Sequence, residues 1–205
     1  MKKKFIHSTI SFLEQYHDYS KNEIDRLRYG LEGIYLTFTK TIIILLIAFI
    51  LGILKEVLIL LVLFNIIRYT GFGFHAEKSY QCFILSTIYF ICIPLFFMHV
   101  KLSFTITVII CSLCILSYFL FAPADTVKRP LPNKKKRIIR KFFTVVIGCI
   151  YSTLIFILPI DFFKPLLLSS LVIQSIVINP LLYKIFGQPY HNYKNYSKVL
   201  NAVGV

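Results

Sequence analysis

Acidic residues and polar stretches are both scarce in this chain. Nine Asp and Glu stand against 23 Lys and Arg, which gives a formal net charge of +14. Hydrophobic residues fill 57% of the 205 positions, and no polar linker, repeat or low-complexity segment is visible. A soluble domain must present much of its surface to water and does not need so many apolar residues. The composition therefore predicts an all-α, polytopic membrane protein, organised as one domain over residues 1–205.

Two further absences narrow the class of protein. The basic N-terminus is not followed by an unbroken apolar stretch, so we expect no cleavable signal peptide. The five Cys are an odd number, and four of them lie inside apolar runs, which argues against a disulfide framework. Cys111 and Cys114 have the spacing of a redox motif, but core packing is the better interpretation for cysteines among apolar neighbours.

Apolar runs long enough to enter a membrane fill most of the chain. Six segments are predicted, at 36–54, 57–67, 83–98, 103–122, 142–160 and 166–186. The second segment is short, because a helix needs about 20 residues to cross the hydrocarbon. It must borrow from the stretch that follows, or form a half-helix that enters a re-entrant or interfacial loop. Residues 36–186 then form the membrane region, and 187–205 a cytoplasmic tail.

The basic residues are distributed unevenly between the connecting segments. With a cytoplasmic N-terminus and six crossings, nineteen Lys and Arg fall inside, and only Lys55, Lys101 and Lys164 fall outside. This is the positive-inside pattern of membrane proteins. It predicts that both termini, residues 68–82 and residues 123–141 face the cytoplasm. Topology accounts for the charge, so we expect no binding to nucleic acid.

The N-terminal region, residues 1–35, has a helical pattern. Ser20 and Glu23 have the spacing of a capping box and predict the start of a second helix. We expect an amphipathic helix, a break, and a helix leading into the first segment; the first either lies on the inner membrane face or caps the bundle. The apolar residues spaced by three and four are Ile6, Ile10, Leu13, Ile24, Leu27, Leu31 and Ile34.

One polar stretch, RYTGFGFHAEKSYQC at 68–82, separates two apolar segments. It contains His75 and Cys82, and a nucleophilic Cys is usually held as thiolate by a His. On a straight helix a separation of seven residues is about 10 Å along the axis, too far for a hydrogen bond. A catalytic pair therefore requires a break in the helix. The alternative is that both residues only pack or snorkel at the membrane boundary.

Other residues of this stretch fit a site. Gly71 and Gly73 permit the turn and would let a substrate backbone come close. Arg68 lies deep enough that it should be paired or functional, for example in holding an oxyanion or a substrate carboxylate. Zinc would need three or four ligands, and no second His/Cys pair is near, so we predict neither a metal nor another cofactor.

A second polar cluster, FAPADTVKRPLPNKKKRIIRK at 121–141, follows the fourth apolar segment. Its prolines predict a loop. An orientation signal at an anionic inner leaflet accounts for most of its basic charge. Asp125 is an unusual acid at this boundary, and it either orients His75 as a third member or pairs with a Lys. The basic run of this loop comprises Lys134, Lys135, Lys136 and Arg137.

These two clusters together resemble the accessory gene regulator B family of bacterial membrane peptidases, over nearly the whole chain. The family commonly shows adjacent glycines before x-His-Ala, whereas here Phe72 separates Gly71 from Gly73, so the role of Gly71 does not follow. The residues that carry the resemblance are Arg68-x4-Gly73-x-His75-Ala76-x5-Cys82 and Ala122-Pro123-Ala124-Asp125-Thr126-x-Lys128-Arg129-Pro130.

The resemblance implies a cysteine endopeptidase of the bacterial cell membrane, with its active site on the cytoplasmic side. His75 and Cys82 match the catalytic pair, and Arg68 and Gly73 match other positions that the family needs. The implied substrate is a small propeptide with an amphipathic leader and an acidic C-terminal tail. The enzyme removes the tail, which the basic loop would hold, and the peptide is cyclised to a thiolactone or lactone quorum-sensing signal.

Two other functions compete with this interpretation. A small transporter or peptide-export component would suit six segments with a broken second one, but transporter sites favour polar groups near the midplane. An enzyme acting on lipid phosphate would want paired Asp for a metal, which the inner face lacks. The partners we expect are the propeptide and the lipid bilayer, and a homodimer stays an open alternative.

Overall fold

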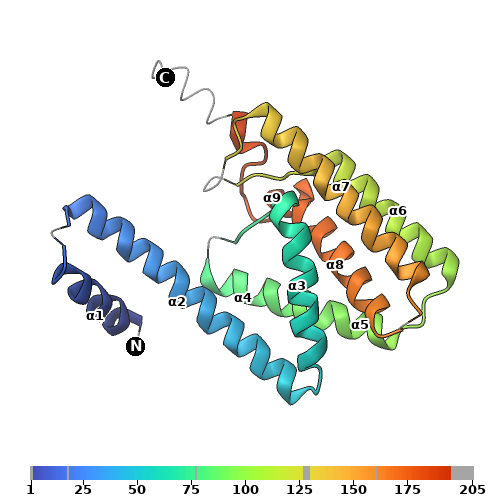
Figure 1. The fold of residues 1–205 in the computed structure, drawn as a ribbon, viewed down its shortest axis with the longest axis horizontal. Coiled ribbons are helices and arrows are strands. Elements are labelled where there is room, and N and C mark those ends of the chain that lie inside the picture. Colours follow the sequence, from blue (N-terminus) through green and yellow to red (C-terminus); the bar gives the residue numbers. More distant parts are fainter. Residues whose placement is uncertain (1, 18, 77, 127–129, 160, 195–205) are drawn as a thin grey trace. The chain divides into compact units, whose positions relative to one another are not determined.

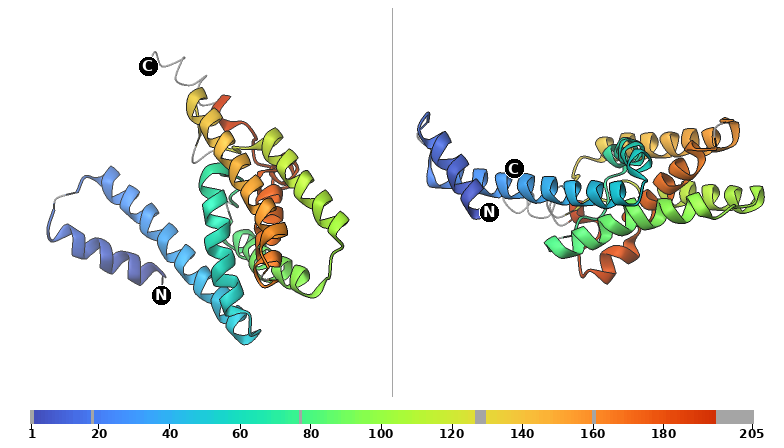
Figure 2. Two further views of the ribbon diagram at one scale, coloured as in Figure 1. Left: turned by 45° about the vertical axis from the view of Figure 1, so that its right-hand side comes forward. Right: turned by 90° about the horizontal axis from the view of Figure 1, so that it is seen from below.

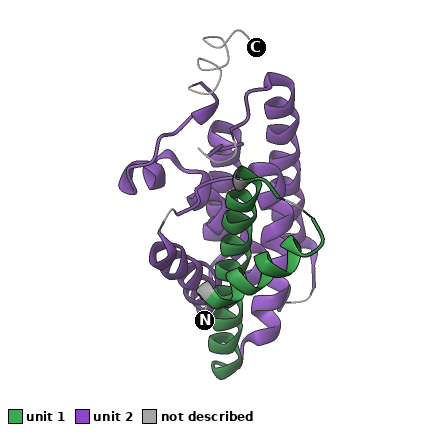
Figure 3. Ribbon diagram, turned by 90° about the vertical axis from the view of Figure 1, so that its left-hand side faces the viewer, with its two compact units in different colours: residues 1–51 green, residues 52–205 purple. Residues whose placement is uncertain are grey.

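The computed structural model of the protein describes residues 2–17, 19–76, 78–126, 130–159 and 161–194. Within these ranges the regular secondary structure is helical, and they contain no β-strand. The chain divides into two compact units, residues 1–51 and 52–205, which Figure 3 colours separately and which are described one at a time.

The first unit consists of α1 (Lys2–Glu14) and α2 (Lys21–Ile50), which pack against each other (Figure 1). Ile6 and Ile10 of α1 are buried, as their helical spacing predicts. At the start of α2 the carboxylate of Glu23 accepts hydrogen bonds of 2.8 Å from the backbone N–H and the hydroxyl of Ser20. The expected pattern of helix, break and second helix is therefore confirmed. The second helix runs without interruption into the first apolar segment.

The second unit is built around one buried helix, α8. Ten of its residues are buried, on all sides of the helix, because α3, α5, α6 and α7 pack around it (Figures 1 and 2). A helix that is apolar on every side can be stable only when it is enclosed in this way. The elements of this unit are α3 (Leu54–Gly71), α4 (Ser79–Thr87), a π-helical turn (Ile88–Cys92), α5 (Ile93–His99), α6 (Phe104–Phe121), α7 (Lys134–Ile157), α8 (Phe163–Ile178) and α9 (Pro180–Ile185).

Four helical stretches of the described chain are long and apolar enough to cross a membrane. They are Asn22–Ile50, Ser79–His99, Phe104–Phe121 and Lys134–Ile157. The all-α membrane fold predicted from composition is thus confirmed, whereas six crossings are not established. Of the two remaining segments, α3 carries three charged residues, and α8 is a shorter apolar helix.

The boundaries of most predicted segments need correction. The segment at 36–54 ends at Ile50, since Leu54 already belongs to α3, and the segment at 83–98 begins at Ser79. The segment at 57–67 is longer than expected, because α3 continues to Gly71 and ends only at the glycine-rich turn. The segment at 166–186 is not one helix. Pro180 has no N–H to donate, and the Asn179 side chain accepts from Leu181 N at 2.9 Å, so a separate short helix begins there. The segment at 142–160 begins earlier, at Lys134.

Candidate active site

The polar stretch 68–82 lies where α3 ends and α4 begins. His75 is exposed in the irregular linker between these helices. Cys82 is partly buried in the first turn of α4, where its N–H donates to Lys78 O at 3.1 Å. The backbone between His75 and Cys82 is therefore not one straight helix, as a catalytic pair at this spacing requires. Residue 77 of this stretch lies outside the described residues.

Arg68 holds the linker in place through its main chain. The guanidinium donates from Nη1 to Phe72 O at 2.7 Å, and from Nη2 to Gly73 O at 3.1 Å and Phe74 O at 2.7 Å. The three carbonyls follow the end of α3, outside any regular helix that could supply them with donors. These three hydrogen bonds therefore join Arg68 to the linker that follows α3, as far as Phe74, the residue directly before His75.

The turn after α3 depends on conformations and spaces that glycine provides. Gly73 has φ 124°, and a Cβ there would meet the Arg68 guanidinium and lie 2.8 Å from Val177 Cγ1. A Cβ on Gly71 would meet the Gln174 amide nitrogen, so close approach gives Gly71 the role that the family pattern left open. Phe72 has φ 53°, in the left-handed half of backbone space where glycine is favoured. It occupies the position at which this chain departs from the adjacent glycines of the family.

The two sequence clusters meet through main-chain hydrogen bonds. Gly73 N–H donates to Ala124 O at 2.8 Å, and Ala124 N–H donates to Gly71 O at 3.1 Å. These bonds make an isolated parallel bridge between Phe72 and Ala124. Phe74 N–H reaches Val177 O of α8 at 2.8 Å. The linker that carries His75 is thus fixed against the loop after α6 and the end of the central helix.

Asp125 is buried beside this bridge, with 2% of its surface exposed. One carboxyl oxygen accepts from Asn192 N at 3.0 Å, and the other accepts from Tyr193 N at 2.7 Å and Leu131 N at 3.3 Å. Its hydrogen-bond partners in the structure are therefore backbone N–H groups. The roles suggested by the sequence, an orienting partner of His75 or the mate of a Lys, stay untested hypotheses.

The basic run 134–137 forms the first turn of α7, where a loop was expected. Asn133 caps this helix, accepting from Lys136 N at 3.2 Å. The three lysines are exposed. Arg137 is partly buried: its Nη1 donates to Leu131 O and Pro132 O, and its guanidinium lies 3.8 Å from the centre of the Tyr193 ring. The lysines and Arg137 thus occupy different environments. Residues 127–129 lie outside the described residues.

Several residues at this site carry no motif that would identify them. Gln174 donates from Nε2 to Phe72 O at 3.1 Å, and Gln188 donates to His75 O at 3.1 Å. The hydroxyl of Tyr183 reaches the carbonyls of Ala124 and Asp125 at 3.3 and 3.2 Å. Gln174 could have been noticed as the only amide side chain in the apolar α8. The other two lie far along the chain, and nothing in their spacing indicates the contact.

Two tyrosines near Asp125, Tyr183 and Tyr190, donate hydrogen bonds to main-chain carbonyls, and Tyr190 reaches Phe121 O at 3.0 Å. A tyrosine hydroxyl is protonated at neutral pH in any case. Burial raises the pKa of Tyr190 further, to about 12, so it stays a donor in alkaline solution as well. In the described residues, no three His, Cys, Asp or Glu side chains gather as a metal ion would need.

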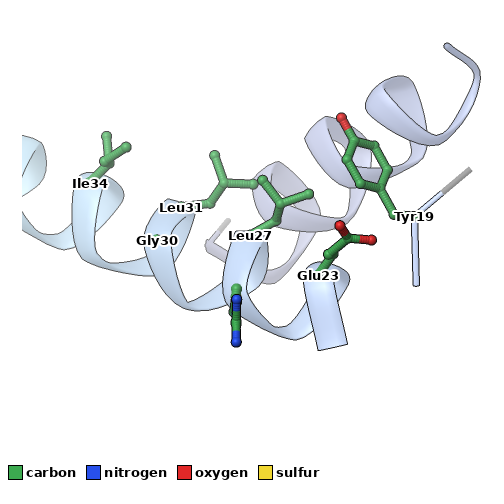
Figure 4. A pocket seen from close by; sticks show the side chains of 7 residues that line it. Tyr19, Glu23, Leu27, Gly30, Leu31 and Ile34 are labelled. Atoms are coloured by element: carbon green, nitrogen blue, oxygen red, sulfur yellow. The ribbon is translucent and has the colours of Figure 1, made fainter. Parts of the chain in front are cut away.

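The first unit has a pocket of its own (Figure 4). Its volume is about 400 Å³ and its walls are mainly apolar. The residues that line it belong to α2, apart from Tyr19, which lies two residues before the helix begins, and none of the candidate site residues is among them. They are Tyr19, Glu23, Arg26, Leu27, Gly30, Leu31 and Ile34.

Comparison with known proteins gives consistent matches. The family model described as accessory gene regulator B matches residues 6–178. An AgrB-like protein of Clostridium acetobutylicum is 29% identical over 180 residues, 87% of this chain and 85% of that protein. An AgrB-like protein of Listeria monocytogenes is 30% identical over 171 residues, 83% and 84% of the two chains. The accessory gene regulator protein B of Staphylococcus aureus is 24% identical over 173 residues, 84% and 91%. No solved structure matches significantly.

The apolar helices, with a polar turn where several of them end, define an all-α membrane protein. The family model and the relatives identify the family within this class, and they confirm the resemblance seen in the sequence. The chain belongs to the accessory gene regulator B family, and this membership supports a role in the agr quorum-sensing system.

Proposed function

We propose that the protein is a membrane cysteine endopeptidase that removes the C-terminal tail of a quorum-sensing propeptide and promotes its cyclisation. One observation carries the proposal most directly. Cys82 lies in the first turn of α4, which begins four residues after the exposed His75. His75 belongs to a linker whose main chain is held by hydrogen bonds to Arg68, Ala124 and Val177. The other four cysteines lie within the helices, away from the polar stretch 68–82. This difference supports Cys82 as the nucleophile of the proposed reaction.

The residues suit acyl transfer to a thiol. Cys82 Sγ attacks the scissile carbonyl carbon while His75 takes the thiol proton, and His75 then gives that proton to the leaving amine of the tail. The product is a thioester between Cys82 and the peptide. A thiol of the same peptide attacks this thioester, which forms the ring and releases Cys82 without ATP. The exchange of an amide for a thioester is uphill, so removal of the products draws the reaction forward.

The basic turn of α7 suits an acidic leaving segment. Lys134, Lys135 and Lys136 are exposed at the N-terminal end of a helix. The positive end of the helix dipole adds to their charge, and both favour an anionic ligand. Arg68 donates to three linker carbonyls, which supports a role in holding the position of His75. A guanidinium has five N–H groups, so this role is compatible with the expected binding of an oxyanion or a substrate carboxylate.

Replacement of the proposed nucleophile tests the function. Cys82→Ala should abolish propeptide cleavage by the purified full-length protein. Cys82→Ser should be nearly inactive, because a hydroxyl ionises far less readily than a thiol. His75→Ala should also stop turnover. The wild-type enzyme should form a hydroxylamine-sensitive adduct on Cys82 that carries the N-terminal part of the propeptide, which mass spectrometry would detect.

The matched control is the variant in which Cys92, Cys111, Cys114 and Cys149 are all replaced by Ala. It should keep cleavage, with a loss of stability at most, because these cysteines are small apolar residues of the helices. If Cys82→Ala still released the tail, Cys82 would not be the nucleophile and the proposed cysteine-peptidase mechanism would be wrong. If the purified wild type released no tail, transport or export of the peptide would take the place of the peptidase function.

A further inference from the structure

A segment near the C-terminus lies against the candidate site although no motif marks it. This segment, residues 187–193, is called the strap below. It follows α9 and lies beyond residue 178, where the match to the family model ends. Its contacts reach the linker that carries His75, the loop that carries Asp125, and the basic start of α7. The strap is therefore the one described segment after α8 that contacts all three.

The attachment of the strap to Asp125 is the most buried of these contacts. Both carboxyl oxygens are used, with Asn192 N at 3.0 Å and Tyr193 N at 2.7 Å. The Asn192 side chain also donates to Asp125 O at 3.3 Å and to Pro189 O at 2.8 Å. Asp125 and Asn192 are 2% and 6% exposed. Hydrogen bonds to a charged acceptor are among the stronger ones, and a buried N–H left without a partner is costly. Asp125 therefore anchors the strap.

The other end of the strap touches the catalytic linker. Gln188 Nε2 donates to His75 O at 3.1 Å, and Gln188 N–H is itself held by Tyr183 O at 2.9 Å. Between the two ends, Tyr190 donates to Phe121 O at 3.0 Å. The carbonyl of His75 is thus fixed by a side chain whose own backbone is fixed by α9. Residues 188–192 thus connect the buried carboxyl group of Asp125 to the carbonyl of His75.

We propose that the strap is a positioning device for His75, with Asp125 as its buried anchor and Gln188 as its contact to the catalytic linker. Asp125 and Gln188 are positioning residues in this arrangement, and neither contacts the reacting atoms. The proposal deepens the peptidase function and rests on it for the effect on turnover. The structural part of it, that release of the strap loosens the linker, stands independently of the activity.

The test uses the full-length protein in lipid nanodiscs and substitutions at two positions, Asp125 and Gln188. Asp125→Asn replaces one accepting oxygen by an NH2 group, which faces an N–H donor. Gln188→Glu keeps the shape of the side chain but removes the donor to His75 O, and Gln188→Lys restores a donor of similar reach. The matched control is Asp161→Asn, at an exposed aspartate whose partner is Lys164. Hydrogen exchange followed by mass spectrometry reports on peptides covering 72–78 and 187–194, and cleavage assays give kcat and KM.

Asp125→Asn should speed exchange in the strap and in the linker by about tenfold, as expected when a buried hydrogen bond is lost. It should lower kcat by a similar factor and leave KM unchanged, because substrate binding is not altered. Gln188→Glu should leave the strap protected, speed exchange in the linker and lower kcat by about three- to tenfold. Gln188→Lys should recover most of that loss, and Asp161→Asn should match the wild type in every measurement.

Two results would overturn the proposal. In the first, Asp125→Asn lowers kcat while the strap stays as protected as in the wild type, which would make Asp125 a direct member of the site. In the second, the strap opens while the linker exchange and kcat are unchanged, which would make the strap a structural element only. If the wild type itself fails to cleave the propeptide, the proposed peptidase function is wrong. The rate of hydrogen exchange in the linker of Asp125→Asn then decides by itself whether the strap holds His75.

Discussion

The guanidinium of Arg68 lies 2.7 Å from the carbonyl oxygen of Phe74, the residue directly before His75. This contact and the bonds to Phe72 and Gly73 join the last turn of α3 to the linker. An arginine in a membrane helix was expected to hold a substrate group or an oxyanion. In the structure it binds the main chain of the linker, and we expect it to act on the proposed chemistry through the position of His75.

Replacement of Arg68 by Lys should lower kcat at least about tenfold, because an ammonium cannot reproduce a planar fork that serves three carbonyls. Arg68→Ala should also lower the free energy of unfolding in detergent by about 1–3 kcal/mol, since partly buried carbonyls lose their donors. Arg28→Lys is the control, because its exposed pair with Asp25 at 3.9 Å contributes little. Full activity of Arg68→Lys would show that the three hydrogen bonds from Arg68 to the linker are not needed for turnover.

Phe72 should respond to substitution in the opposite order from an ordinary helical residue. At φ 53° a Cβ is unfavourable, so Phe72→Gly should be more stable than Phe72→Ala by about 1 kcal/mol. At Ile66, an exposed position within α3, the order should reverse, with Ala more stable than Gly by about 1 kcal/mol. Thermal or denaturant unfolding of the four variants measures both differences. The same order at both positions would contradict the unusual backbone conformation at Phe72.

The basic turn should act on substrate affinity rather than on chemistry. Replacing Lys134, Lys135 and Lys136 together by Gln should raise KM several-fold and leave kcat unchanged. This result is expected when a variant loses an interaction that holds the substrate and the transition state equally well. Raised salt should reproduce the effect on the wild type, because the charges are exposed. Adding Arg137→Gln should also reduce stability, because Arg137 holds the loop before α7. Lys101→Gln serves as the control, and unchanged kinetics of the triple variant would leave the lysines as an orientation signal.

The uneven distribution of Lys and Arg predicts the topology. In a background without native cysteines, single cysteines at positions 78 and 135 should resist an impermeant reagent added to intact cells and react after lysis. A cysteine at position 101, predicted to face outside, should react in intact cells. Labelling of position 78 or 135 from outside would overturn the topology and, with it, the cytoplasmic placement of the site.

Some of the fold was predictable because local rules decide it. The apolar runs gave the helices, Ser20 and Glu23 gave the start of α2, and the glycines around Phe72 gave the turn between His75 and Cys82. The basic run 134–137 was predicted to lie in a loop because Pro130 and Pro132 precede it. These prolines prevent helix only before Asn133, which caps α7, and the lysines that follow are good helix formers.

The remaining features depend on contacts between distant residues. Apolar helices resemble one another in composition, so the sequence could not show that α8 alone is enclosed by its neighbours. The carboxyl group of Asp125 is met by N–H groups 67 and 68 residues later in the chain. Backbone donors carry no side-chain signature, which is why a catalytic role or a lysine partner was the natural expectation for this acid.

The length of α8 sets the distance between the two ends of the second unit. Sixteen residues of helix extend about 24 Å, somewhat less than the hydrocarbon of a bilayer, which is about 30 Å thick. The Asp161–Lys164 pair lies at the N-terminal end of α8, and Val177 O at its C-terminal end receives Phe74 N–H of the linker. The linker that carries His75 is therefore held about one helix length away from that pair, because the buried helix between them acts as a rigid spacer.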